Sequence, residues 1–133
     1  MSEVRKEARD WYDAALVDLE EAHSALACGR VNWAVFAAHQ AVEKALKAAF
    51  MILKRERPPK THDIVRLFSE LGLTLPKELE IGLSELSPYY VVARYPNAGL
   101  ERPWETIDKR LAEKLVSIAG EVVKEVGKTM GFR

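Results

Sequence analysis

The segment WAVFAAHQAVEKALKAAFMILKR, residues 33–55, decides the fold. It is rich in Ala, Leu, Glu and Lys, which are strong helix formers. Apolar side chains cover most of its circumference at about 100° per residue, so we expect a central helix that is largely buried. Asn32 is expected to cap the first turn of this helix. Pro58 and Pro59 are expected to stop it.

The same helix also carries polar side chains, which project within about 140° of one another. A polar strip on an otherwise buried helix must face solvent, a partner or a cleft. The members of this strip are therefore candidate ligand-binding residues. They are His39, Gln40, Glu43, Lys44 and Lys47.

The rest of the chain predicts further helices. Residues 4–28 place apolar side chains at spacings of three and four, and Gly29 follows as a left-handed stop. A final helix with the same periodicity is expected over 105–129, capped by Thr106, and a shorter one over 76–87. Short connections favour antiparallel neighbours. The predicted fold class is therefore all-α, an up-and-down antiparallel four-helix bundle.

An extra short helix and one long loop complete this prediction. The short helix is expected over 62–71, capped by Thr61 and ended by Gly72. Pro88 breaks the helix that precedes it. Residues 95–104 contain two Pro, one Gly and one Asn, which favour a loop.

The composition excludes several classes of protein. The chain has 133 residues with 20 basic and 20 acidic side chains, so no global basic excess draws it to nucleic acid. Its one Cys rules out a disulfide framework or a Cys-rich zinc site, and its three His lack metal-ligand spacing. No signal peptide or apolar run of ~20 residues is present. We expect a single cytoplasmic domain over 1–133, without a membrane segment, metal or cofactor.

The charge is nevertheless uneven along the chain. Residues 44–66 hold seven basic and two acidic side chains, while the flanking segments are acidic. One interpretation is a solvated surface turn. The other is a site for phosphate groups or for an acidic partner.

Four short stretches together carry a resemblance to a known family. They are Trp11-Tyr12 with Asp18-Leu19, the segment 33–48, the run 61–64, and Tyr89-Tyr90 with 93–97. With these the chain resembles a stand-alone HEPN domain (higher eukaryotes and prokaryotes nucleotide-binding) over about residues 9 to 128.

The resemblance implies a helical bundle that usually forms a homodimer. It also implies pairing with a small nucleotidyltransferase in a two-component system of toxin–antitoxin type. Nucleotide or RNA binding is a further implication. Some members of the family are ribonuclease toxins that use an Arg followed, after four to six residues, by His.

That ribonuclease motif is incomplete in this sequence. Arg94 lies in the matching loop, but the positions where His should follow are Gly99, Leu100 and Glu101. None of these side chains can shuttle a proton near neutral pH as imidazole does. No catalytic residue is therefore assigned. Arg57 and His62 have the same spacing in a different loop, where His62 is expected to cap or pack at a helix start.

The loop around Arg94 supplies the other candidate binding residues. On a helical segment Tyr90 and Arg94 share a face. The pair could stack a base and grip a phosphate, or it could pin the loop onto the bundle. The full set of candidates adds Tyr95, Asn97 and His62 to these two residues and the polar strip.

Three hypotheses for function remain. The leading one is a homodimeric, non-catalytic module that binds a nucleotide, RNA or the nucleotidyltransferase partner. The second is a metal-independent endoribonuclease toxin. The third is a purely structural dimerisation scaffold.

Overall fold

The structure, a computed structural model, describes residues 2–132, and every regular element in that range is helical. No helix among these residues is long and apolar enough to cross a membrane. The predicted all-helical fold class is confirmed. The elements are α1 (Ser2–Ala27), α2 (Val31–Ala49), the π-helical turn η1 (Phe50–Lys54), α3 (Ile64–Leu71), α4 (Lys77–Leu86), α5 (Tyr89–Val92), α6 (Pro103–Thr106) and α7 (Lys109–Met130).

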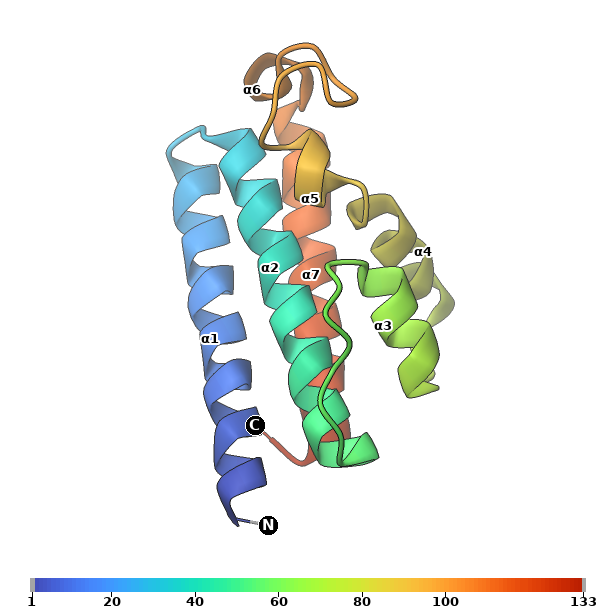
Figure 1. The fold of residues 1–133 in the computed structure, drawn as a ribbon. Coiled ribbons are helices and arrows are strands. Elements are labelled where there is room, and N and C mark those ends of the chain that lie inside the picture. The colour runs from blue at the N-terminus through green and yellow to red at the C-terminus, as the bar shows by residue number, and fades with distance from the viewer. Residues whose placement is uncertain (1, 133) are drawn as a thin grey trace.

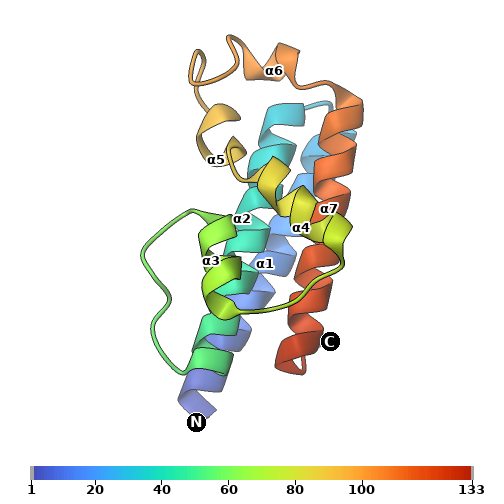
Figure 2. The same ribbon diagram turned by 90° about the vertical axis from the view of Figure 1, so that its right-hand side faces the viewer.

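The chain passes up and down the molecule, as the short connections predict. In Figure 1, α1 rises from the N-terminus, α2 descends beside it, α4 leads back up and α7 descends to the C-terminus. The two termini therefore lie at the same end. Helix α3 is the extra short helix, and α4 crosses the bundle obliquely (Figure 2). Helix α2 lies in the middle, in contact with α1, α3, α5 and α7.

The contact between α1 and α2 is the most extensive in the bundle, and it is built largely from alanine. Ala8, Ala15 and Ala22 recur every seven residues along α1 and are completely buried. Ala34 and Ala41 are equally buried on α2. Because such small side chains allow two helix axes to approach closely, α2 can bury one side against α1 without bulky residues.

A tyrosine fixes α1 against α7. The hydroxyl of Tyr12 donates a hydrogen bond to the Val123 carbonyl over 3.1 Å, and burial raises its pKa. Gly127 makes room for the ring, since a Cβ at that position would overlap the Tyr12 hydroxyl. The Tyr12 ring also packs on buried Phe132. The C-terminal end of the bundle is thereby tied to α1.

Three of the predicted helix caps are wrong. Two of these errors have a local cause, and the third has a tertiary one. Thr61 does not cap α3; Asp63 does, accepting a hydrogen bond from the Arg66 amide. Thr106 ends the separate turn α6, and Asp108 caps α7. Asp and Thr are both good caps, so composition alone could not separate neighbouring candidates. The predicted glycine stops are confirmed at Gly29 and Gly72, which have φ of 79° and 69°.

The third cap failed because of a tertiary contact. Asn32 lies inside α2 rather than at its N-cap, and Arg30 occupies the cap position without a side-chain hydrogen bond. The Asn32 amide instead donates to the Ala93 carbonyl over 3.2 Å. This buried hydrogen bond holds the segment after α5 against the start of α2. That position matters for the site.

Candidate functional site

Arg94 lies just after α5, held against a group of aromatic rings. Its Nε donates a hydrogen bond to the Tyr90 carbonyl over 2.7 Å, which fixes the side chain on its own turn. The guanidinium carbon lies 4.3 Å from the centroid of the Tyr90 ring, 4.8 Å from that of Phe36 and 4.9 Å from that of Tyr95. A cation at these distances is attracted by each ring. The predicted sharing of a face by Tyr90 and Arg94 is therefore present.

His62 packs on the same tyrosine from a different part of the chain. Its imidazole is stacked on the Tyr90 ring, with centroids 4.1 Å apart and planes at 13°. The Nδ1 atom lies 3.0 Å from one carboxylate oxygen of Glu43 and 3.1 Å from the other. Because a carboxylate only accepts hydrogen bonds, Nδ1 is the protonated nitrogen. The side chain is 54% exposed and thus accessible to a ligand.

Glu43 links His62 to a lysine of the same helix. The Lys47 ammonium donates to Glu43 over 3.0 Å, one helical turn away. The side chain of Glu43 is only 7% exposed and that of Lys47 is 11% exposed. Both are shielded from solvent, so this ion pair is screened less than a surface pair. Lys47, Glu43, His62, Tyr90 and Arg94 form a continuous chain of contacts, which we call the α2–α5 cluster.

His39 lies beneath this cluster and is completely buried. Its ring is 5.5 Å from that of Tyr90. Within residues 2–132, neither imidazole nitrogen has a hydrogen-bond partner of normal geometry. Burial lowers its pKa to about 4, although the charge of Glu43 and the nearby Ser87 backbone act in the opposite direction. The imidazole is therefore neutral at pH 7.

The structure divides the predicted polar strip into two faces. His39, Glu43 and Lys47 belong to the side of the α2–α5 cluster. Lys44 lies on the α1 side instead, where its ammonium is 2.8 Å from an oxygen of Asp18. Gln40, one turn before Lys44, is partly buried and has no side-chain hydrogen-bond partner among the described residues.

The two remaining candidates flank Arg94 in the loop. Tyr95 is 52% exposed and contacts the guanidinium. Asn97 is exposed with φ of 62°, and its backbone amide donates to the carbonyls of Leu100 and Glu101. The side chain of Asn97 forms no hydrogen bond with another residue in the described range. Its backbone shapes the loop.

Phe36 lies on this face but is not among the candidate residues that the sequence predicted. Its ring contacts Arg94 and lies 5.9 Å from Tyr90, while half-exposed Trp33 packs edge-on against it at 6.0 Å. The available signal was its register, because Phe36 stands one turn before His39 and two turns before Glu43. An aromatic residue at that spacing is more often part of a core.

The fixed positive charge of Arg94 is the electrostatic feature of this face that could attract an anion. Arg94 forms no ion pair with any carboxylate in the described part of the chain, although its guanidinium is fixed. Its free nitrogens can donate two parallel hydrogen bonds to a phosphate. Tyr95 and Trp33 offer exposed ring faces on which a base could stack. Across residues 2–132, no group of three His, Cys, Asp or Glu side chains could hold a metal ion.

The fold and the site together define a class of protein, a small helical bundle that holds a fixed arginine among aromatic rings. A family model described as the HEPN domain matches residues 8–129. The chain therefore belongs to the HEPN family. None of the curated proteins matches the chain.

Three solved structures resemble the chain over almost its full length. TT1696 from Thermus thermophilus is 32% identical with a TM-score of 0.80, covering 91% of this chain and 96% of that one. ST0689, an archaeal HEPN homologue, is 29% identical with a TM-score of 0.77, covering 92% and 97%. An HEPN domain protein from Thermotoga maritima is 28% identical with a TM-score of 0.73, covering 92% and 98%.

Proposed function

We propose that this protein is a non-catalytic binding module that recognises a phosphate of a nucleotide or RNA through Arg94. In this proposal it acts as a homodimer together with a small nucleotidyltransferase, in a two-component system of toxin–antitoxin type. Membership of the HEPN family supports the partnership, since the family often has this organisation.

One observation carries the binding proposal. The guanidinium of Arg94 rests on three aromatic rings and is fixed by a hydrogen bond to its own turn, yet it has no carboxylate partner within residues 2–132. Its hydrogen-bonding nitrogens other than Nε therefore stay available to an anion. A fixed and unpaired arginine has already lost its conformational entropy, so an incoming phosphate does not bear that cost.

Binding can be measured by fluorescence anisotropy with labelled single-stranded RNA of ten nucleotides. Replacing Arg94 by Ala should weaken binding at least tenfold. It should also reduce the slope of log affinity against log salt by about 0.7, the contribution of one phosphate contact on a single strand. Light scattering with and without the nucleotidyltransferase tests the assembly.

Arg102 provides a matched control for Arg94. Its guanidinium also lies over an aromatic ring, that of Trp104, but it is paired with Glu105. Arg102→Ala should leave RNA affinity unchanged. Equal affinity of wild type and both variants for RNA and for nucleotides would refute the binding site and favour the scaffold hypothesis.

The position of His62 favours a second candidate, the metal-independent endoribonuclease. The family motif lacks its histidine in this sequence, but the structure brings His62 onto the same tyrosine ring as Arg94. Glu43 holds Nδ1 of His62, leaving Nε2 free to accept a proton from a ribose hydroxyl. The same RNA, run on a denaturing gel after incubation, separates the two functions. Cleavage lost in both Arg94→Ala and His62→Gln would favour the enzyme, and intact RNA favours the binding module.

A further inference from the structure

The basic segment identified in the sequence has two kinds of cation. Lys44, Lys47 and Arg66 are each paired with a carboxylate. The others form no ion pair with any carboxylate in the range that the structure describes. These four unpaired cations fall within seven residues, with Glu56 as the only acidic side chain between them. They are Lys54, Arg55, Arg57 and Lys60.

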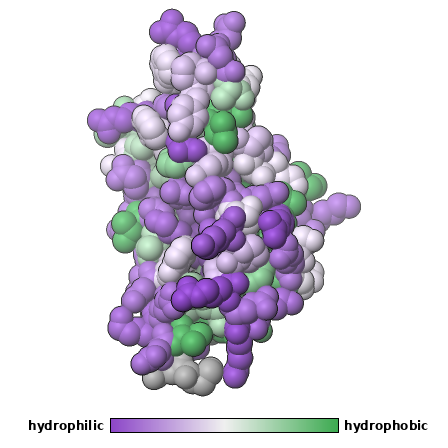
Figure 3. Space-filling view, in the orientation of Figure 1, coloured by the Kyte–Doolittle hydropathy of each residue, from purple (hydrophilic) through white to green (hydrophobic). Residues whose placement is uncertain are grey.

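Three of the unpaired cations lie along a loop that leads to the α2–α5 cluster, and the fourth, Lys54, ends η1 just before it. The loop, residues 55–63, starts at the end of η1, runs back alongside α2 and ends at α3 (Figures 1 and 2). Pro58 and Pro59 keep it out of a helix. Near its far end is His62, which is stacked on Tyr90. Figure 3 shows that hydrophilic side chains dominate this face of the molecule.

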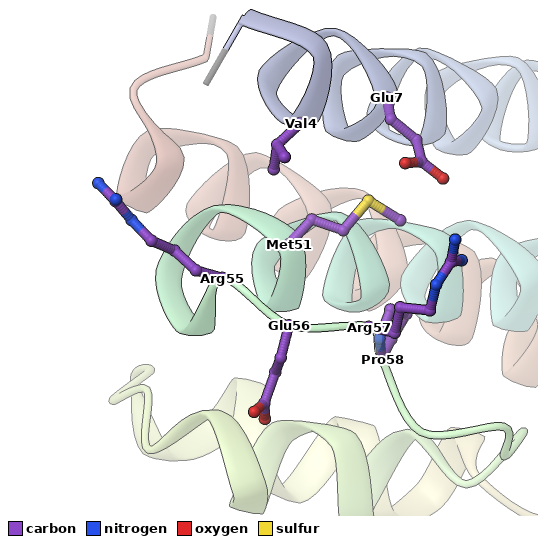
Figure 4. Close-up of a pocket in the computed structure, with 7 residues that line it drawn as sticks. All are labelled: Val4, Glu7, Met51, Arg55, Glu56, Arg57 and Pro58. Carbon is purple, nitrogen blue, oxygen red and sulfur yellow. The ribbon is translucent and has the colours of Figure 1, made fainter.

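A cavity of about 290 Å³ lies at the other end of the loop. In Figure 4, Val4 and Met51 face each other across it, and the Arg57 guanidinium and the Glu7 carboxylate stand at one side. Pro58 adds to its apolar lining. A cavity of roughly 150 Å³ is enough to hold benzene. This one therefore has room for a flat aromatic ring.

We propose that the ligand is a single-stranded RNA several nucleotides long, which extends from the α2–α5 cluster along residues 54–62 to this cavity. The inference rests on the proposed function, because Arg94 is the first phosphate contact. The unpaired cations would contact successive phosphates, and the cavity would take one base. Residues 55–62 are eight residues, which can span at most ~27 Å when extended, and a path of that length has room for several nucleotides.

The pattern of the surface favours a polynucleotide over an acidic protein. Aromatic rings lie at one end and an apolar cavity lies at the other, with unpaired cations on the loop that joins them. Single-stranded nucleic acid needs this combination, because its bases stack on rings while its phosphates follow a cationic groove. An acidic protein segment would use the cations and leave the aromatic rings and the apolar cavity unoccupied.

The test compares ligand length in wild type and in a charge variant. Anisotropy is measured with labelled uridylate oligomers of two, four, six and ten nucleotides. Wild-type affinity should rise at least tenfold from the dinucleotide to the hexanucleotide. The triple variant Arg55→Gln, Arg57→Gln, Lys60→Gln should lose that gain, and its salt slope should fall by about 2, as three single-strand phosphate contacts require.

The control removes the same charge from another face. Lys109, Arg110 and Lys124 are exposed on α7 and have no ion pair among residues 2–132. The variant with Gln at these three positions should keep the wild-type dependence on length and salt. Circular dichroism and urea unfolding confirm that both triple variants are folded.

The outcomes that contradict the inference are distinguishable. If Arg94→Ala weakens dinucleotide binding but affinity does not increase with length, the extended path is wrong and the proposed function stands. If Arg94→Ala has no effect on any oligomer, the proposed function fails as well. If the loop variant binds RNA of every length as tightly as wild type does but loses affinity for a polyglutamate peptide, the loop serves an acidic partner and the inference is overturned.

Discussion

The two sides of α2 solve the same problem of burial in different ways. The side toward α1 buries small apolar residues such as Ala34 and Ala41 completely, and its ion pair between Lys44 and Asp18 is partly exposed. The side toward α5 buries an imidazole, a carboxylate and an ammonium within three turns. On the first side close approach of the helices supplies the stability. On the second, ionic and aromatic contacts only offset the cost of burying polar groups.

The difference separates apolar packing from polar burial on this helix. Replacing a buried ion pair by apolar side chains is often neutral or stabilising. Stability alone therefore does not explain Glu43, Lys47 and His39 on the second side, whereas it fully explains the alanines on the first. The alanine side therefore positions the bundle, and under the proposed function the polar side serves the site.

The largest effect should come from opening a cavity in the apolar part of the bundle. Leu115 lies on α7 and is completely buried. Its replacement by Ala should reduce the free energy of unfolding by about 4 kcal/mol, because transfer energy is lost and a cavity remains. Urea unfolding measures this change. RNA affinity of the folded fraction should be unchanged. A parallel loss of affinity would show that the polar side of α2 is not independent of the apolar part of the bundle.

A smaller effect should come from acid, through His39 on the polar side. Burial lowers the folded-state pKa of His39 to about 4, below the ordinary value of 6.5. Between these values the unfolded chain binds a proton that the folded chain excludes, so stability falls as pH falls. The free energy of unfolding is therefore unaffected by protonation of His39 well above pH 6.5. Through His39 it should decrease by about 3 kcal/mol between pH 7 and pH 4.

This pH effect can be isolated by comparing variants. Carboxylates also titrate in this range, and Glu43, Asp63 and His62 all act on His39. The measurement is therefore the difference in unfolding free energy between wild type and His39→Gln at several pH values. That difference should shrink toward pH 4, while exposed His23→Gln should follow wild type. Parallel profiles for His39→Gln and wild type would show that the imidazole does not stay neutral.

The same contrast explains how much of the molecule was predictable from the sequence. The helical segments and the glycine stops depend on local periodicity and backbone freedom, so they could be predicted. Their exact ends were less accurate, because the expected helix 105–129 is divided into α6 and α7 and the expected helix 33–55 ends in the π-helical turn η1. The wrong cap at Asn32 depended on the Ala93 carbonyl, which lies 61 residues away. Local pattern carries no information about such a partner.

The site was predictable in its members but not in its arrangement. Helical spacing identified the polar residues of α2, yet it could not show that Lys44 pairs with α1 while Lys47 pairs with Glu43. The path of the loop over residues 55–63 placed His62 on Tyr90. That path is fixed by tertiary packing rather than by any local signal.

The smallest effect should come from removing a polar contact in the apolar part of the bundle. Tyr12 is buried and donates its hydrogen bond to the Val123 carbonyl across the contact of α1 with α7. Tyr12→Phe should cost about 1 kcal/mol, the net value of one hydrogen bond. The loss stays small because the carbonyl keeps its partner within α7. Urea unfolding measures it, with exposed Tyr95→Phe as the control that should not change stability. A loss as large as that of Leu115→Ala would mean that the hydroxyl organises the packing of α1 on α7, so that the apolar part of the bundle too depends on a polar group.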